Sequence, residues 1–203
     1  MSHKIITIAR QFGSGGHEAG ERLSKKLRIP LYDRSLVEMA ARELQLSPVS
    51  VEKVDESALH SFLRTYHVPE DPKEAARYGL PLTDNTYLVQ TALIKKLAAQ
   101  GPCIIIGRCG SFILRDDPGL IDVFLCASKK DRIARIMERY GIPERDAASA
   151  VRQTDNRRRQ YYETYTKEEW GSIESHQMLM NVSMLGMEKV VEIIEGMYNQ
   201  GRG

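Results

Sequence analysis

The stretch that decides the fold is Lys4-Ile-Ile-Thr-Ile-Ala-Arg-Gln-Phe-Gly-Ser-Gly-Gly-His-Glu18, close to the start of the sequence. Its isoleucines form an apolar run that predicts a buried strand. A glycine-rich turn follows at Gly13–Gly16, and residues 18–27 have the pattern of a helix. Such a turn lets backbone N–H groups converge on an anion, with the positive end of the helix dipole behind them. The stretch therefore predicts a phosphate cradle, although a tight turn without a ligand has the same local pattern.

The loop departs from the Walker A motif, which reads Gly-x-x-x-x-Gly-Lys-Ser/Thr. With Gly15 as the second glycine of the motif, Arg10 stands at the first glycine and Gly16 at the lysine. His17 then stands at the hydroxyl position. The backbone cradle is thus kept while the two side chains that meet phosphate and Mg²⁺ are replaced. Arg10, or an arginine further along the chain, is the candidate for the missing positive charge.

The rest of the sequence alternates short apolar segments with amphipathic ones. Segments at 29–33, 102–108, 120–126 and 178–182 predict strands, and those at 36–44, 87–100, 129–139, 144–165 and 187–198 predict helices. Strands this short and apolar, separated by helices, predict a parallel sheet buried on both faces. Residues 47–84 carry several prolines and charges without a regular apolar period, and we interpret them as a helical insert within one domain.

Composition limits the classes of function. The 203 residues are 42% hydrophobic and 28% charged, which is typical of an ordinary soluble domain. The net charge of +2 gives no support for a nucleic-acid partner, and no apolar run is long enough to predict a membrane segment. Three widely spaced cysteines, at 103, 109 and 126, predict reduced thiols and a cytoplasmic location. Nothing in the sequence predicts an oligomeric state.

No metal held by protein side chains alone is expected. The five histidines show no ligand spacing, and we interpret each as a surface or capping residue; they are His3, His17, His60, His67 and His176.

Polar residues follow the predicted strands at their carboxyl ends, where ligands bind on parallel sheets. Arg108 comes directly after a buried strand, so its planar guanidinium is able to reach a phosphate or to pair with a structural carboxylate. Asp33 ends another strand, where it either orients an acceptor or a metal-bound water, or is itself structural.

Positive charge is concentrated in one region of this nearly neutral chain. Arg152, Asp155 and Arg157–Arg159 lie on one predicted helix and are followed by Tyr161 and Tyr162. A run of charges is usually a solvated helix face. Four more arginines just upstream, at 132, 135, 139 and 145, favour instead a polyphosphate partner, since phosphoryl transfer needs several cations.

Taken in order, these stretches resemble the cytidylate kinase-like family, a branch of the P-loop nucleoside monophosphate kinases. The resemblance covers nearly the whole chain. The matching stretches are 8–16, 29–34, 105–108, 155–162 and 181–186.

The resemblance implies a three-layer α/β/α fold with a central parallel sheet of about five strands, within a single domain over residues 1–203. It places an acceptor-binding insert at about 47–84 and an arginine-rich lid at about 140–166. It also implies ATP-dependent phosphoryl transfer to a nucleoside monophosphate, with CMP or dCMP the first candidates and Mg²⁺ as cofactor. Small-molecule nucleotides are then the partners.

The resemblance also assigns site residues. The donor phosphates would be held by Gly13, Ser14, Gly15, Gly16 and His17. Asp33 and Arg34 would lie in the monophosphate pocket, and Arg108 would bind the acceptor phosphate. Arg157 and Arg158 would be lid arginines over the transferring group, and Asp155 in the same stretch would bind the nucleotide phosphates. Residues 181–186 would lie near the donor base.

Two departures from the family pattern leave alternatives open. Gly16 in place of the lysine is compatible with a weak or inactive module that only binds a nucleotide or an anion. Cys109 stands where cytidylate kinases carry an aspartate that recognises the base, so the acceptor is open and includes non-nucleotide compounds.

Overall fold

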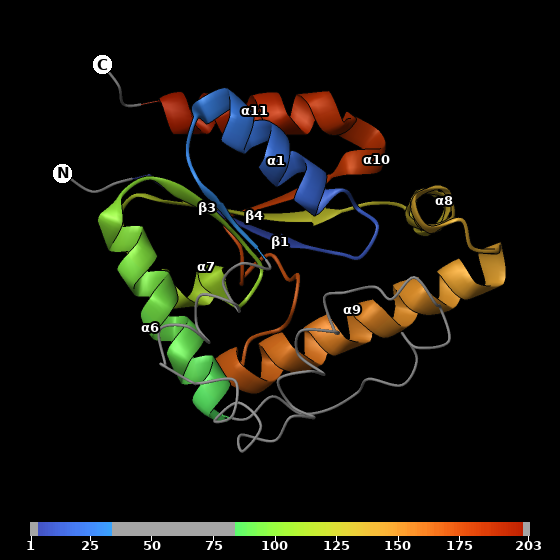
Figure 1. Cartoon of the computed structure of the whole chain (residues 1–203), viewed down its shortest axis with the longest axis horizontal. Helices are drawn as coiled ribbons and strands as arrows, with labels where there is room; N and C mark the ends of the chain where they lie inside the picture. The colour runs from blue at the N-terminus through green and yellow to red at the C-terminus, as the bar shows by residue number, and fades with distance from the viewer. Residues whose placement is uncertain (1–3, 34–83, 201–203) are drawn as a thin grey trace, which may run out of the picture.

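The computed structural model describes residues 4–33 and 84–200. Five strands of this part of the chain form one parallel sheet in the order β2-β3-β1-β4-β5 (Figure 1). Their bounds are β1 (Ile5–Arg10), β2 (Leu31–Tyr32), β3 (Cys103–Ile106), β4 (Leu120–Cys126) and β5 (Met178–Asn181). The predicted parallel sheet is confirmed, and the strand that leads into the glycine loop lies at its centre.

Helices cover both faces of the sheet. Their bounds are α1 (Gly16–Leu27), α6 (Asp84–Gln100), α7 (Gly110–Ile113), α8 (Lys129–Tyr140), α9 (Glu144–Thr166), α10 (Val182–Leu185) and α11 (Met187–Asn199). Figure 1 shows α1 and α11 on one face and α6, α7 and α9 on the other, which confirms the three-layer fold. Arg34, the predicted helix at 36–44 and nearly all of the insert at 47–84 lie outside the described residues.

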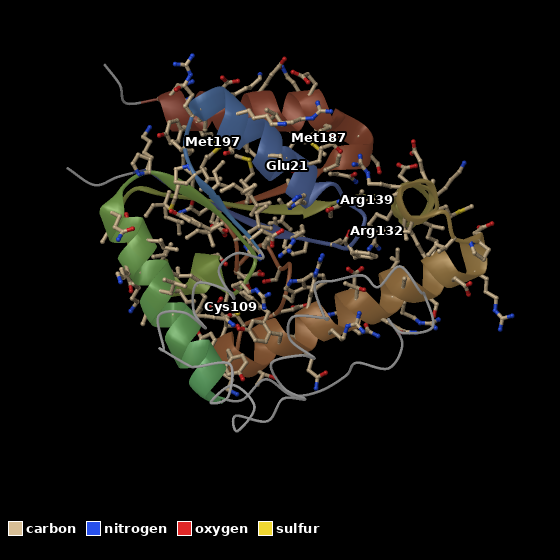
Figure 2. All side chains as sticks on the ribbon, in the orientation of Figure 1. Glu21, Cys109, Arg132, Arg139, Met187 and Met197 are labelled. Carbon is tan, nitrogen blue, oxygen red and sulfur yellow. The ribbon has the colours of Figure 1, made fainter. Side chains whose placement is uncertain are left out.

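Burial on both faces explains the unbroken apolar run of β1. Ile6 and Ile8 belong to the core under α1 and α11, whereas Ile5 belongs to the core under α6. Figure 2 shows Met187 and Met197 of α11 on the first side and Cys109 on the other. Because successive strand residues point to opposite faces, a strand between two helical layers needs apolar residues at nearly every position.

A smaller core joins the glycine loop to the two basic helices. Phe12, from the loop after β1, packs with Ile136 of α8 and with Ala147 and Val151 of α9. The loop is therefore docked against the α8–α9 pair, in which α9 covers most of the region predicted as the lid at about 140–166.

One polar network lies inside the sheet. Thr7 donates a hydrogen bond to Asp122 at 2.6 Å across the paired strands β1 and β4, and His176 Nδ1 lies 2.8 Å from the other Asp122 oxygen. His176 is buried, so the expectation that it is a surface or capping residue is wrong. A carboxylate placed within a sheet needs such partners, since burial of an unpaired charge is costly.

No helix among residues 4–33 and 84–200 is long and apolar enough to cross a membrane.

Candidate functional site

The glycine loop has the backbone of an anion cradle. Gly13 and Gly15 have φ angles of 80° and 88°, in the left-handed region that favours glycine. Helix α1 begins at Gly16, and no side chain caps its N-terminus. The first amide groups of a helix have no partner within that helix, so they are directed at any anion bound there.

Ser14 closes the loop internally. Its hydroxyl donates a hydrogen bond to the Gln11 carbonyl oxygen at 2.9 Å, and the residue is buried. The Ser14 side chain thus stabilises the turn, and its contribution to an anion site comes from the backbone.

Asp155 and Arg132 hold the same loop from the side of the basic helices. The Phe12 amide donates to Asp155 Oδ1 at 2.7 Å, and Arg132 donates both to the Phe12 carbonyl and to the other Asp155 oxygen. Both oxygens of Asp155 are therefore engaged in shaping the loop. This geometry supports a structural role for Asp155, in contrast to the phosphate contact that its place in the sequence suggested.

Arg10 crosses the site from the end of β1. Its Cγ and Cβ lie 2.7 and 2.8 Å from the point where a Cβ at position 16 would stand. Its Nη1 lies 2.0 Å from the point where a Cβ of Gly107 would stand, and its Nη2 lies 3.5 Å from Asp33 Oδ1. The arginine side chain therefore occupies the space that side chains at positions 16 and 107 would need.

Asp33 is largely buried and connects Arg10 with His17. His17 Nδ1 donates to Asp33 Oδ2 at 2.9 Å, while His17 Nε2 lies 3.4 Å from Glu21. Burial alone would raise the pKa of Asp33, but the hydrogen bond from His17 and the charges of Arg10, His17 and Arg108 outweigh it and lower this pKa. The hydrogen bond to Asp33 is the largest cause that raises the pKa of His17, against the opposing effect of burial.

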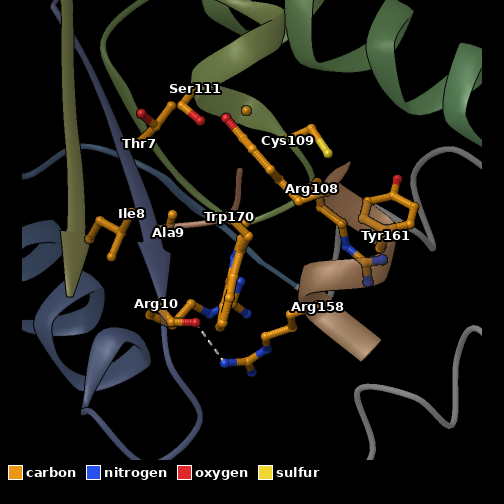
Figure 3. Close-up of a pocket in the computed structure, with 13 residues that line it drawn as sticks. Thr7, Ile8, Ala9, Arg10, Arg108, Cys109, Ser111, Arg158, Tyr161 and Trp170 are labelled. Atoms are coloured by element: carbon orange, nitrogen blue, oxygen red, sulfur yellow. Dashed lines mark hydrogen bonds between the residues drawn. The ribbon is translucent and has the colours of Figure 1, made fainter. Parts of the chain in front are cut away.

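A cavity opens beside the glycine loop, at the carboxyl ends of β1 and β3 (Figure 3). Three arginines line it, namely Arg10, Arg108 and Arg158, together with the rings of Tyr161 and Trp170. Its remaining lining residues are Thr7, Ile8, Ala9, Gly107, Cys109, Gly110, Ser111 and Tyr162. The cavity combines positive charge with aromatic surface, as a ligand that carries a phosphate and a planar ring requires.

The arginines reach this cavity from three different elements. Arg108 follows β3 in a left-handed backbone conformation, with φ of 61°, and is buried. Arg158, on α9, donates a hydrogen bond to the Arg10 carbonyl oxygen at 3.0 Å, drawn as a dashed line in Figure 3. Its neighbour Arg157 donates to Thr154 at 3.2 Å and is not among the lining residues of this cavity.

Tyr161 and Cys109 complete the cavity wall. The Tyr161 hydroxyl donates to the buried side chain of Gln90 on α6 at 3.2 Å, which fixes the ring. Burial raises the pKa of the Cys109 thiol to about 12 and outweighs the opposing charge of Arg108. Cys109 is therefore neutral and does not replace the negative charge of an aspartate at this position.

The other side of the glycine loop faces α8 and α11. A Cβ at Gly15 would lie 2.4 Å from Cε of Met187 and 3.2 Å from a guanidinium nitrogen of Arg135. Met184, in the short helix α10 that precedes Met187, is exposed. Apolar and cationic groups thus border the cradle on the side where the sequence resemblance expects the donor base.

Sequence reasoning found the three arginines but missed part of the wall. Trp170 belongs to no motif and lies in the turn after α9, so only the fold brings it to the cavity. Gln90 is likewise one polar residue in an otherwise ordinary helical segment, without a local signal for its contact with Tyr161.

A glycine loop between the central strand of a parallel sheet and its helix, beside an arginine-lined cavity, defines a P-loop kinase-like α/β protein. A sequence model described as the cytidylate kinase-like family matches residues 5–184, and the chain belongs to this family. Its fold and family are those of a kinase that transfers a phosphoryl group. Comparison with curated protein sequences gives no significant match.

Solved structures confirm the fold. An uncharacterized protein from Eubacterium ventriosum is 23% identical, with a TM-score of 0.73 over 97% of this chain and 99% of that one. A shikimate kinase from Bacteroides thetaiotaomicron is 12% identical, with a TM-score of 0.52 over 97% and 98%. A gluconokinase from Sinorhizobium meliloti is 18% identical, with a TM-score of 0.50 over 98% of each chain. At these identities the likeness concerns the fold alone.

Members of this family generally use ATP and Mg²⁺. The described residues suit the phosphates of ATP more clearly than they suit the metal ion. The uncapped start of α1 and the two left-handed glycines suit donor phosphates. No group of three metal-binding side chains is found in the parts of the chain that the structure describes. Mg²⁺ usually keeps several waters and binds through one or two carboxylates together with substrate phosphates. Asp33, which contacts Arg10 and His17, is one described carboxylate near the start of α1 that suits this mode.

Proposed function

We propose that the protein transfers the γ-phosphoryl group of ATP to a nucleoside monophosphate, with CMP or dCMP as the preferred acceptor. The observation that carries this proposal is the cavity in which Arg10, Arg108 and Arg158 lie together with Tyr161 and Trp170 beside the glycine loop. Guanidinium groups suit the acceptor phosphate, and aromatic rings suit a planar base.

The donor phosphates bind to the backbone amides at the start of α1, where the helix dipole favours negative charge. The acceptor phosphate binds to Arg108 and Arg158, which enter the cavity from β3 and from α9. An oxygen of the acceptor phosphate then forms the new bond to the γ-phosphorus, the bond from this phosphorus to the bridging oxygen breaks, and ADP leaves. When bound, Mg²⁺ would supply positive charge that neutralises the donor phosphates.

Charge stabilisation and positioning account for catalysis in this proposal. Phosphoryl transfer passes through a loose transition state whose charge is spread over the oxygens of the transferring group. Arginines that are buried and held by neighbouring groups stabilise this charge without the cost of reorganisation. Arg10, with its backbone bound by Arg158 and its head group beside Asp33, fits this description.

The base preference is supported by the family rather than by a specific contact. The cavity-lining residues that the structure describes include no carboxylate, and Cys109 is neutral. Two other functions follow if the proposal fails. One is a module that binds a nucleotide or an anion without turnover, and the other is a kinase for a non-nucleotide acceptor.

The test is acceptor-dependent ADP release from ATP and Mg²⁺, measured with CMP, dCMP, UMP, AMP, GMP and, as non-nucleotide acceptors, shikimate and gluconate. The proposal expects turnover with a nucleoside monophosphate and a preference for CMP or dCMP. Arg158→Gln should raise the acceptor KM, whereas Arg145→Gln, on the exposed start of the same helix, should leave it unchanged. ATP binding without turnover on any acceptor indicates a binding module, and turnover only on a non-nucleotide indicates the other kinase.

A further inference from the structure

We propose that Arg10 supplies the positive charge that a Walker A lysine would supply, reaching the donor phosphates from the end of β1 instead of from the start of α1. The inference rests on the proposed function and adds the residue that contacts the transferring phosphoryl group. In this inference, glycine at positions 16 and 107 leaves room for the Arg10 side chain. Asp33 and His17 are the residues that position Arg10.

The stem of Arg10 fills the space beside position 16. Position 16 is where the motif has its lysine, and a Cβ there would lie 2.7 Å from Arg10 Cγ and 2.8 Å from Arg10 Cβ. These are atoms of the inner part of the side chain, which cannot swing away as a guanidinium end can. A lysine at position 16 and the observed Arg10 are therefore mutually exclusive, and the chain contains the arginine.

The guanidinium of Arg10 extends from the cradle toward the cavity. Nη1 of Arg10 lies against Gly107, in the turn that leads to Arg108, while the stem lies against the first residue of α1. The charged end is thus located between the donor cradle and the wall of the cavity that Arg108 and Arg158 line. A phosphoryl group that passes from the cradle to an acceptor in this cavity must cross this space.

Neighbouring side chains hold the Arg10 side chain in place. Arg10 is buried, its Nη2 lies 3.5 Å from Asp33 Oδ1, and the other Asp33 oxygen accepts a hydrogen bond from His17. Asp33 thus orients the buried guanidinium of Arg10, and His17 orients Asp33. Functional side chains are usually positioned in this way, by neighbours that are themselves held in place. His17 stands at the hydroxyl position of the motif, so both replaced positions of the loop serve the same arginine.

A reciprocal exchange tests the inference through binding alone. Calorimetry measures the affinity of the full chain for inorganic tripolyphosphate and for ATP in the wild type, Arg10→Met, Gly16→Lys and the double variant Arg10→Ala/Gly16→Lys. Arg10→Met should weaken both affinities by about tenfold or more, the usual effect of losing a hydrogen bond to a charged group. Gly16→Lys alone should also weaken binding, because the lysine stem collides with Arg10. The double variant should recover most of the affinity, because the lysine then takes the vacant place.

Gly16→Ala provides a test that removes no charge. Its added methyl group meets the Arg10 stem, whereas Gly196→Ala, in α11, meets nothing within 4 Å and serves as the matched control. We expect weaker tripolyphosphate binding for Gly16→Ala and wild-type binding for Gly196→Ala. Circular dichroism confirms that each variant is folded, and Arg10→Lys, which keeps a charge, should retain more affinity than Arg10→Met.

The outcomes separate this inference from the proposed function. Unchanged tripolyphosphate binding in Arg10→Met, tighter binding in Gly16→Lys alone, or no binding by the wild type would overturn it. Wild-type binding that depends on Arg10, combined with no turnover on any acceptor, would support the role of Arg10 and refute the kinase proposal.

Discussion

Asp155 and Arg132 hold the backbone of Phe12 at both of its polar groups: the carboxylate accepts from the amide, and the guanidinium donates to the carbonyl. The two side chains also form an ion pair with each other, and both are largely buried. The first turn of the glycine loop is therefore fixed by residues that lie more than a hundred positions away in the sequence.

This arrangement predicts a large loss of stability for Asp155→Ala. The substitution leaves the Arg132 charge without its carboxylate and the Phe12 amide without its acceptor, and removal of one partner of a buried pair costs about 3–5 kcal/mol. The free energy of unfolding in urea measures it. The double variant Arg132→Met/Asp155→Ala should lose less than the sum of the single variants, and strict additivity would contradict the coupling.

The His17–Asp33 pair predicts a dependence of stability on pH. Because the pKa of folded His17 is raised above its ordinary 6.5, its stabilising effect is complete below about pH 6.5 and is lost as the pH rises through the folded pKa. The pKa of Asp33 is instead lowered from 3.8, so its contribution disappears only when the pH falls through the acidic range.

We therefore expect the wild type to exceed His17→Gln in stability by more at about pH 6 than at about pH 9. Urea unfolding of both proteins at the two pH values measures this difference. An equal difference at both values would show that the pair contributes no proton-linked stability.

Gly107→Ala should impair the site by more than its backbone strain explains. Gly107 has a φ of 71°, and an added Cβ would lie 2.0 Å from Arg10 Nη1. Gly141 has a similar φ of 64° with nothing within 4 Å, so Gly141→Ala carries the strain alone, of about 1–2 kcal/mol.

Both alanine variants should lose comparable stability in thermal unfolding, while only Gly107→Ala should also lose affinity for ATP, by about tenfold or more. Equal ATP affinity in the two variants would mean that Arg10 adjusts without consequence.

Cys109→Asp should change the choice of acceptor. The position lines the cavity with a φ of 56°, a conformation that aspartate adopts more readily than most residues. A carboxylate there provides an acceptor for the amino group of cytosine, which uracil lacks. The ratio of kcat/KM for CMP over UMP should therefore rise, and Cys109→Ser, which adds no charge, is the matched control. An unchanged ratio would place the base elsewhere.

The sheet could be predicted from sequence because its strands are buried on both faces. The predicted strand at 120–126 agrees with β4 at both ends, as its apolar run is bounded by polar residues and turns. β2 is only two residues long, and α1 begins two residues before the predicted helix. Glycines at the start of a helix carry no periodicity, so the pattern could not show that Gly16 is already helical.

Residues of the candidate site could be predicted from sequence only where they stand at or directly after the end of a strand. Arg10, Asp33 and Arg108 each lie at or just after the end of a strand, and the structure brings them together. Their pairing depends on the direction of the side chains, which periodicity does not specify. The buried contact between Asp122 and His176 joins residues 54 positions apart and left no sign beyond one aspartate within an apolar run.

The path of Arg10 across two glycines has a consequence for how substrates affect one another. The stem of this one side chain lies against Gly16, the first residue of α1, and its tip lies against Gly107, in the turn before Arg108. In the proposed kinase, a ligand that draws the Arg10 guanidinium toward one side changes the surface offered to the other ligand. We therefore expect the binding of donor and acceptor to be coupled. Thermodynamic linkage then requires symmetry: whatever factor the donor imposes on the affinity for the acceptor, the acceptor imposes on the affinity for the donor.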